Sequence, residues 1–384
     1  MGEWKECKLG DVSEIVGGGT PKTKVPEYWN GEIPWLTPRD LSNFSGRYIS
    51  KGERNISKLG LANSSAKILP KGAILLSSRA PVGYLAIALD EMSTNQGFRS
   101  LIPNSKTNSL FLFYLLKNNV DYLKSQSTGT TFGELAGSTL KSLSFLFPPL
   151  PEQRAIASVL SSLDDKIDLL HRQNKTLEAM AETLFRQWFV EEAEEGWEEG
   201  CLPDEFDFTM GQSPPGDSYN EEGIGVPLFQ GNADFGFRFP TNRVYTTDPK
   251  RFAEKYDTLI SVRAPVGAQN MAFEKCCIGR GVAAFRYKYN NSFYTYTYFK
   301  LKSLMNEIKQ YNETGTVFGS ISKSDFQNLG MTIPSKEEVI KFQEIAKPID
   351  AKIIKNNVQI RTLSKLRDTL LPKLMSGEVG VEYE

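Results

Sequence analysis

The chain has 384 residues, and its 45 lysines and arginines nearly balance its 46 aspartates and glutamates. This length predicts two or three domains, each able to bury its own core. Neither an apolar run of roughly 18 residues nor the apolar core of a signal peptide is present, so we expect a cytoplasmic protein without a membrane partner. The four cysteines are scattered and His171 is the only histidine, so the sequence predicts neither a disulfide framework nor a metal site.

Residues 1–150 are expected to form a first mixed α/β module. Short β-rich runs alternate with turns: residues 73–77 and 84–88 flank a Pro-Val-Gly turn, and residues 110–123 show a helical pattern. This module carries 17 basic and 12 acidic residues. A nucleic-acid partner would therefore meet a locally basic surface, because the nearly neutral chain offers no overall attraction.

Residues 151–190 are predicted to form one long helix. Apolar side chains recur in alternating steps of four and three from Ile156 to Trp188, which is typical of the contact seam of a coiled coil. Pro151 and Glu152 suit the first helical turn, and at 1.5 Å per residue the helix would be about 55 Å long. An acidic, exposed linker is expected over residues 191–200.

The second half repeats the first. We expect a second module over residues 201–335, a second long helix over residues 336–376 and a C-terminal tail over residues 377–384. The Arg-Ala-Pro-Val-Gly stretch at residues 79–83 returns at residues 263–267, and Leu163-Asp164 returns as Ile349-Asp350. The predicted fold class is therefore α/β (α+β), a two-module repeat in which two globular modules are separated by a pair of long antiparallel coiled-coil helices with pseudo-two-fold symmetry.

Each predicted seam contains one asparagine, Asn174 in the first helix and Asn356 in the second. A single polar seam residue commonly fixes the register of a helix pair at some cost in stability. We expect the two asparagines to lie close together near the middle of the pair. The alternative is that either side chain faces water at the edge of the seam.

No catalytic constellation stands out in the sequence. His171 lies within the predicted helix, beside the seam, where a solvated or partner-facing role is far more common than that of a catalytic base. The run Gly17-Gly18-Gly19-Thr20 lacks both the Lys-Ser/Thr ending of a phosphate-binding P-loop and the spacing of a dinucleotide fingerprint. We therefore expect no catalytic residue and no cofactor bound by this chain.

The repeated loops contain candidate DNA contacts. Arg79 and Arg263 could bind base edges or phosphates, but a structural role, with each arginine paired to a carboxylate of its own module, is favoured because identical residues suit different bases poorly. Thr130 and Thr316 could donate to a phosphate oxygen or cap a turn.

Base-reading residues are better sought where the two copies diverge, because Arg, Lys, Asn and Gln match the edges of bases in the major groove. The candidates are Arg39, Asn43, Arg47, Lys51 and Arg54 in the first module, and Gln230, Asn232, Arg238 and Arg243 in the second.

The sequence resembles the specificity (S) subunits of type I restriction-modification systems over nearly its whole length. The motifs that carry the resemblance are LGDV at residues 9–12, GGTP at 18–21, IPWL at 33–36, the two Arg-Ala-Pro-Val-Gly stretches, and FPPLPEQRAI at 147–156 running into the seam helix. Individually these motifs are weak, but their order and their duplication are specific.

The resemblance implies a non-catalytic DNA reader. Residues 1–150 and 201–335 would be target-recognition domains, each binding one half of a bipartite, asymmetric double-stranded site, and the long helices would set the spacer between the halves. In the family the helices also dock two methyltransferase subunits, which use S-adenosylmethionine to methylate adenine, and restriction subunits add ATP- and Mg²⁺-dependent translocation and cleavage.

The second copy departs from the family pattern at residues 333–339, and its seam includes Arg367, so the two docking surfaces are expected to be unequal. Two alternatives stay open: a coiled-coil scaffold without DNA readout, and a nuclease or methyltransferase with an unrecognised site.

Overall fold

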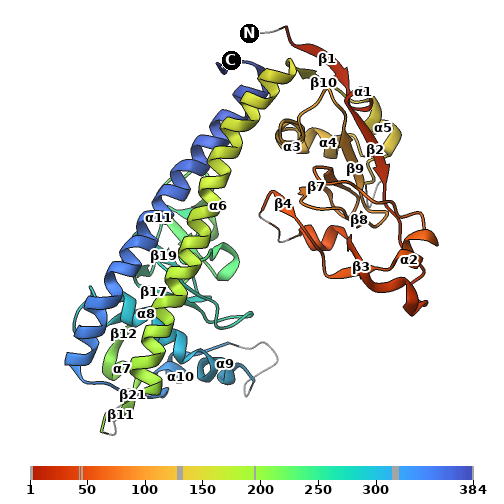
Figure 1. The fold of residues 1–384 in the computed structure, drawn as a ribbon. Coiled ribbons are helices and arrows are strands. Elements are labelled where there is room, and N and C mark those ends of the chain that lie inside the picture. The colour runs from red at the N-terminus through yellow and green to blue at the C-terminus, as the bar shows by residue number, and fades with distance from the viewer. Residues whose placement is uncertain are drawn as a thin grey trace. The chain divides into compact units, whose positions relative to one another are not determined.

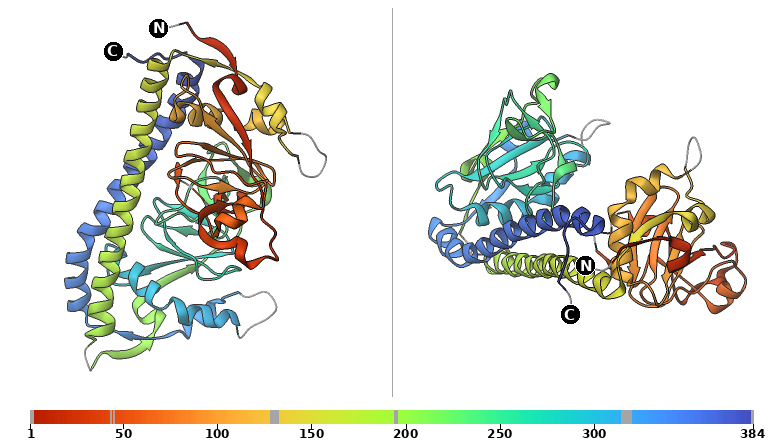
Figure 2. Two further views of the ribbon diagram at one scale, coloured as in Figure 1. Left: turned by 45° about the vertical axis from the view of Figure 1, so that its right-hand side comes forward. Right: turned by 90° about the horizontal axis from the view of Figure 1, so that it is seen from above.

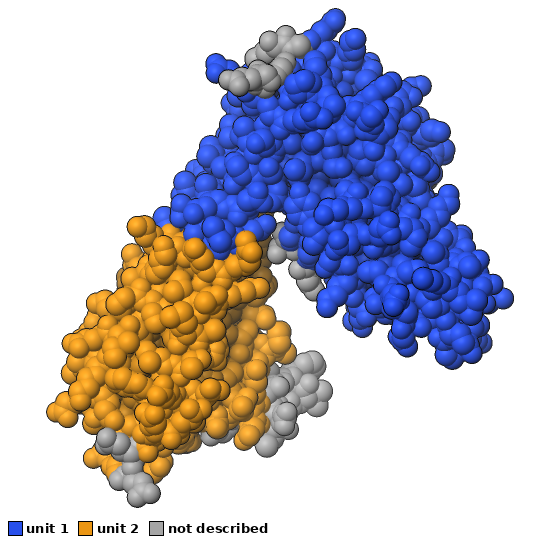
Figure 3. Space-filling model, viewed as in Figure 1, with its two compact units in different colours: residues 1–171, 358–384 blue, residues 172–357 orange. Residues whose placement is uncertain are grey.

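The computed structural model describes residues 3–42, 44, 46–127, 133–193, 196–313 and 320–382. The chain divides into two compact units, residues 1–171 with 358–384 (unit 1) and residues 172–357 (unit 2), which Figure 3 distinguishes by colour. Each unit combines one globular module with part of both long helices (Figure 1). No helix in the described part of the chain is long and apolar enough to cross a bilayer.

The module of unit 1 is built on a five-stranded mixed sheet in the order β2-β9-β6-β7-β4. The central strand β6 is buried along its whole length, as its apolar run predicts. Asn108 caps the main covering helix, α3, by accepting the N–H of Phe111, and the apolar side chains of α3 enter the core beneath the sheet. The strands are β1 (Lys5–Lys8), β2 (Ser13–Gly17), β3 (Trp29–Leu36), β4 (Tyr48–Ile49), β5 (Arg54–Ile56), β6 (Ile74–Ser78), β7 (Val82–Ala88), β8 (Ser93–Thr94), β9 (Arg99–Pro103) and β10 (Ser144–Phe147). The helices are α1 (Leu9–Val12), α2 (Lys58–Ala62), α3 (Ser109–Asn118), α4 (Val120–Ser125) and α5 (Gly137–Ser142), with short 3₁₀ turns η1 (Pro26–Tyr28) and η2 (Pro38–Leu41).

The module of unit 2 repeats this plan with a four-stranded sheet, β12-β20-β17-β18, and a five-stranded sheet, β13-β15-β14-β19-β16. Its strand β17 is fully buried like β6, and helix α8 covers the sheet as α3 does in unit 1. The strands are β11 (Glu198–Cys201), β12 (Phe206–Met210), β13 (Tyr219–Asn220), β14 (Val226–Phe229), β15 (Tyr245–Thr246), β16 (Phe252–Ala253), β17 (Thr258–Ser261), β18 (Gln269–Met271), β19 (Cys276–Ile278), β20 (Val282–Tyr287) and β21 (Gly330–Ile333). The helices are α7 (Leu202–Glu205), α8 (Tyr294–Ser303), α9 (Met305–Glu313) and α10 (Lys323–Gln327), with 3₁₀ turns η4 (Gly216–Ser218) and η5 (Asn232–Asp234).

The sequence repeat is also a repeat of hydrogen bonds. In unit 1 the Ser77 hydroxyl donates to the carbonyl of Pro81, at 2.8 Å, and in unit 2 the Ser261 hydroxyl donates to the carbonyl of Pro265, also at 2.8 Å. Both prolines follow a cis peptide bond. The predicted two-module repeat is confirmed.

The two predicted long helices are α6 (Leu150–Arg186), which continues as a wider π-helical turn η3 (Gln187–Glu191), and α11 (Lys336–Ser376). In unit 1, Ile156 near the start of α6 shares a core with Leu374 near the end of α11, whereas Ile167 further along α6 packs with the earlier Ile360. The helices therefore run antiparallel, as predicted. Figure 2 shows them side by side in two further views.

The two seam asparagines lie in unit 2 and contact each other. The Asn356 side chain donates from Nδ2 to Oδ1 of Asn174 at 2.9 Å, and each residue is only 1% exposed. The water-facing alternative is thereby ruled out for both.

Candidate nucleic-acid interface

In unit 1, exposed basic side chains lie on loops that are tied together by one carboxylate. Arg39 is on η2 and Lys51 is in the loop between β4 and β5, and both are exposed. The Asp40 carboxylate accepts the N–H of Thr37 and the N–H of Glu53, each at 2.7 Å. The two loops are therefore held together, and their basic side chains face solvent from one connected region.

Arg54 follows on β5 and is held by aromatic side chains. Its guanidinium carbon lies 3.5 Å from the centre of the Trp29 ring, and Trp29 packs edge-on against Trp35. The Trp35 indole N–H donates to the carbonyl of Gly19 at 2.9 Å. This cation–π contact pre-orders an exposed guanidinium beside the Arg39 and Lys51 loops.

The turn after β6 joins this region through the loop at residues 95–97, because the N–H of Ser78 donates to the carbonyl of Gly97 at 2.7 Å. Arg79 and Arg99 share the Glu134 carboxylate, at 3.6 and 3.0 Å. Arg79 therefore pairs with a carboxylate of its own module, which was the favoured expectation, although it stays partly exposed.

The glycine run of the first module also packs on this loop. A Cβ atom added at Gly18 would lie 2.0 Å from the carbonyl oxygen of Asn95, and the N–H of Gly19 donates to the carbonyl of Thr94. These glycines permit a close approach of two backbone segments.

Unit 2 builds a corresponding region with different side chains. The N–H of Val262 donates to the carbonyl of Gly281 at 2.9 Å, which is the equivalent of the Ser78 to Gly97 bond. Exposed Gln230 follows β14, and its backbone packs against Gly281. Asn232, half-buried, begins η5 in the same loop.

Two further candidates of unit 2 are exposed and flank these loops. Arg243 donates from Nε to Oδ1 of Asp234, the last residue of η5, at 2.9 Å. Arg263 directly follows Val262 and forms an isolated strand bridge with Ser320.

The equivalence of these two loops identifies two residues that sequence reasoning missed. Gln96 precedes Gly97, Arg280 precedes Gly281, and both side chains are exposed. The hydroxyl of Thr20 makes a short hydrogen bond to the Gln96 side chain. A signal was present, since the two glycines are separated by the same 184 positions as the two Arg-Ala-Pro-Val-Gly stretches.

Two of the predicted base readers, Arg47 and Arg238, are buried rather than exposed. Arg47 is 5% exposed and pairs with Asp165 and Asp164 of α6, and Arg238 is 1% exposed and donates to Asp350 of α11 at 2.6 Å. Their guanidinium groups are already bound to buried or helix-bound carboxylates, so neither is available to a base edge. The candidates Asn43, Thr130 and Thr316 lie outside the described residues.

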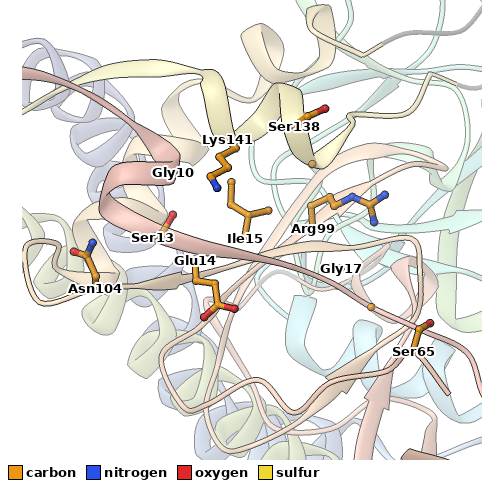
Figure 4. A pocket seen from close by; sticks show the side chains of 12 residues that line it. Gly10, Ser13, Glu14, Ile15, Gly17, Ser65, Arg99, Asn104, Ser138 and Lys141 are labelled. Atoms are coloured by element: carbon orange, nitrogen blue, oxygen red, sulfur yellow. The ribbon is translucent and has the colours of Figure 1, made fainter. Parts of the chain in front are cut away.

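A pocket of about 890 Å³ opens in unit 1 along strand β2 (Figure 4). It is lined by polar and charged groups from several elements, among them Lys141 of α5, Arg99 of β9 and Glu14 of β2. The described residues contain no group of three His, Cys, Asp or Glu side chains placed to hold a metal ion. The mixed charge of the lining suits a hydrated polar groove at the edge of the sheet.

A smaller pocket in unit 2, of about 470 Å³, is lined in part by Glu205, Trp197 and Lys336. Burial raises the pKa of Glu205 to about 7, and its Oε1 accepts the hydroxyl of Tyr296 at 2.7 Å. Burial likewise raises the pKa of Asp257 to about 6, even though Arg286 lies beside it. Both carboxyls lie within the folded core of the module, where they couple its stability to pH.

Two similar α+β modules, each carrying exposed basic and amide side chains on equivalent loops and each packed on part of an antiparallel helix pair, define a two-module recognition protein. The family model described as "Type I restriction modification DNA specificity domain" matches residues 1–179 and again residues 194–365, and the chain belongs to this family.

Its relatives include the type I restriction enzyme MjaIX specificity subunit of Methanocaldococcus jannaschii, 36% identical over 99% of this chain and 94% of that protein. The putative MjaX specificity subunit of the same organism is 33% identical over the same shares. The crystal structure of the type I S subunit from M. genitalium matches with a TM-score of 0.61 and 20% identity, covering 97% of this chain and 96% of that one, and so shares the fold.

Proposed function

We propose that this chain is the DNA-reading subunit of a type I restriction-modification complex, in which residues 1–150 read one half of a bipartite, asymmetric double-stranded site and residues 201–335 read the other. One observation carries the proposal: the same backbone frame presents a different side chain in each module. Ser78 and Val262 bond equivalent glycine carbonyls, yet the exposed residue beside them is Gln96 in one module and Arg280 in the other. Glutamine suits adenine and arginine suits guanine, so equivalent loops with different chemistry fit two different half-sites.

The helix pair would set the spacer between the half-sites and dock two methyltransferase subunits. Support comes from exposed apolar side chains at helix positions related by the 186-residue repeat. Val159 of α6 corresponds to Ile345 of α11, and Met180 of α6 corresponds to Leu366 of α11. Apolar side chains that face water at repeated positions suit two similar protein contacts.

In this proposal the chain provides recognition and its partners provide the chemistry. S-adenosylmethionine would be bound by the methyltransferase subunits, and ATP and Mg²⁺ would serve the restriction subunits. The names of the relatives as specificity subunits support this division of roles.

The test is co-expression of the chain with a cognate methyltransferase subunit, followed by single-base mapping of adenine methylation. We expect a split motif with one fixed spacer. Gln96→Ala should relax only one half of the motif and Arg280→Ala only the other, whereas Arg154→Ala, an exposed change at the start of α6, should alter neither. Methylation that does not depend on a folded, bound chain would favour the scaffold alternative.

The spacing role has its own test. Inserting about four residues, one helical turn, at matched positions of α6 and α11 should lengthen the preferred spacer. The enzyme alternative is examined by incubating the isolated chain with DNA, Mg²⁺ and S-adenosylmethionine, where methylation or cutting would overturn the adaptor role.

A further inference from the structure

The two buried arginines occupy equivalent positions in the two modules. The carbonyl of Arg47 accepts the N–H of Ile87 on β7, and the carbonyl of Arg238 accepts the N–H of Met271 on β18. Ile87 and Met271 are related by the same 184 positions that separate the two Arg-Ala-Pro-Val-Gly stretches. Each arginine is therefore fixed by its backbone to the central sheet of its own module.

In unit 1 the side chain of Arg47 contacts α6 directly and is linked to α11 through the Asp164 carboxylate. It pairs with Asp165 of α6 and lies 3.7 Å from Asp164, and it donates to the hydroxyl of Tyr114 at 3.3 Å. The Tyr114 hydroxyl in turn donates to Asp164 at 2.7 Å, and Arg367 of α11 donates to the other oxygen of the same carboxylate at 2.7 Å. We call Arg47, Tyr114 and Asp164 the first clamp.

In unit 2 the same three residue types meet again. Arg238 donates to Asp350 of α11, and its guanidinium carbon lies 3.7 Å from the centre of the Tyr298 ring. It also lies 3.9 Å from Glu178 of α6, so this side chain contacts both helices directly. Asp350 is the repeat equivalent of Asp164, and Tyr298, like Tyr114, lies on the helix that covers the sheet of its module. Arg238, Tyr298 and Asp350 form the second clamp.

A buried guanidinium is expensive to desolvate, and its flat, forked shape requires its partners at defined angles. An apolar contact between module and helix would tolerate sliding, because dispersion and hydrophobic forces are not directional. Two charge-bearing contacts at equivalent places therefore restrict movement of each module along the helix pair.

We propose that Arg47 and Arg238 are positioning residues that hold each recognition module at one place on the helix pair, and so limit the spacer lengths the protein accepts without reading any base. This inference rests on the proposed function for its effect on spacers, but the restriction of movement can be measured on the isolated chain.

The first measurement places nitroxide labels at Lys51→Cys, in the β4–β5 loop, and Lys166→Cys, on α6, in a chain whose partly exposed cysteines are replaced by serine. Pulsed electron paramagnetic resonance then gives the distribution of distances between the two labels, both of which lie in unit 1. We expect a narrow distribution in the parent chain and in the control Arg154→Met, and a broad one in Arg47→Met. A folded Arg47→Met chain with an unchanged distribution would overturn the clamp.

Milder changes keep the test decisive if Arg47→Met does not fold. Asp165→Asn removes one charge partner that is 68% exposed, so it should broaden the distribution while leaving the core intact. Arg47→Lys keeps the cation but loses the fork, and should give an intermediate width. A narrow distribution in both folded variants would also reject the proposal.

The second measurement maps methylation on DNA libraries in which the two half-sites are separated by variable spacers. Arg47→Met or Asp165→Asn should raise methylation at neighbouring spacer lengths about tenfold relative to the parent, because less DNA deformation is then required, with the half-site sequences unchanged. A changed half-site, or an unchanged spacer profile despite a broad distance distribution, would overturn the spacing role. If the parent chain directs no split-site methylation, the proposed function fails while the distance measurement still decides the clamp.

Discussion

Replacing one member of the Asn174–Asn356 pair by leucine should destabilise the protein, whereas replacing both should not. The pair is joined by one hydrogen bond of 2.9 Å, and both side chains are buried in the seam between α6 and α11. The Oδ1 atom of Asn356 is itself buried without a hydrogen-bond partner. The seam therefore already contains one unsatisfied polar atom. Asn174→Leu would also leave Nδ2 of Asn356 unpaired, whereas Asn356→Leu would remove the unsatisfied atom and leave Oδ1 of Asn174 unpaired.

The magnitude follows from the burial of the partner that is left behind. A buried polar group without its partner costs about 1–3 kcal/mol. Asn174→Leu should therefore lower the free energy of unfolding by about 2 kcal/mol, and Asn356→Leu by about 1 kcal/mol because it also removes an unsatisfied oxygen. The double variant buries two apolar side chains in place of the amides, and each buried leucine contributes roughly 1.5–3 kcal/mol. We expect the double variant to equal or exceed the parent chain in stability, so the coupling energy, which is the double effect minus the sum of the two single effects, should be at least about 3 kcal/mol.

The assay is a double-mutant cycle measured by urea denaturation of the full chain. Gln173→Leu, an exposed change one residue away, is the control and should shift the unfolding free energy by less than about 0.5 kcal/mol. Two single effects that simply add in the double variant would show that the asparagines do not depend on each other, and the reasoning would fail.

Three further predictions follow from other contacts. Burial raises the pKa of Glu205 from 4.5 to about 7, so the folded chain binds this proton more tightly than the unfolded chain, and the free energy of unfolding falls as the pH rises through that window. In Glu205→Gln, the unfolding free energies from denaturation at pH 5 and at pH 8 should differ less than they do in the parent chain. Gly18→Ala should destabilise unit 1 by about 1–3 kcal/mol, since its methyl group would overlap a backbone carbonyl, whereas Gly216→Ala, with nothing within 4 Å of the new methyl, should be tolerated in thermal unfolding. Arg39→Ala and Gln230→Ala should each weaken DNA binding by about 1–3 kcal/mol, the first through one half-site only and the second through the other. Binding titrations with DNA in which one half-site at a time carries a changed sequence will measure this.

The long helices and the repeat could be predicted from the sequence because each produces a regular spacing of similar residues. The steps of four and three from Ile156 to Trp188 describe a helix with one apolar seam, and that seam is buried against α11. The one asparagine in each seam predicted the Asn174–Asn356 contact for the same reason, since a polar residue in an apolar seam favours a polar partner.

The buried arginines could not be found in this way. Arg47 and Arg238 lie in divergent stretches rich in Arg, Lys and Asn, where composition favours an exposed, nucleic-acid-facing role. Their burial depends on Asp164 and Asp350, which are more than a hundred residues away in the sequence. The repeat of the two aspartates could be seen in the sequence, but no local sequence pattern predicts which arginine pairs with each of them.

Gln96 was overlooked for a different reason. Its importance comes from the hydrogen bond between Ser78 and the neighbouring carbonyl of Gly97, which places the loop beside the repeated turn. A backbone hydrogen bond between two loops can be made by almost any residue, so apart from Gly97 the sequence of this loop did not indicate the contact.

The discontinuous composition of unit 1 has a consequence for synthesis on the ribosome. Unit 2 is one continuous stretch, residues 172–357, whereas unit 1 joins residues 1–171 to residues 358–384. The core that contains Leu160 is closed by Leu371 and Leu374, which emerge some two hundred residues later. Nascent domains generally fold from the N-terminus as they appear, but here the module that is translated first must wait, with part of its apolar core exposed, until the last helix has left the exit tunnel.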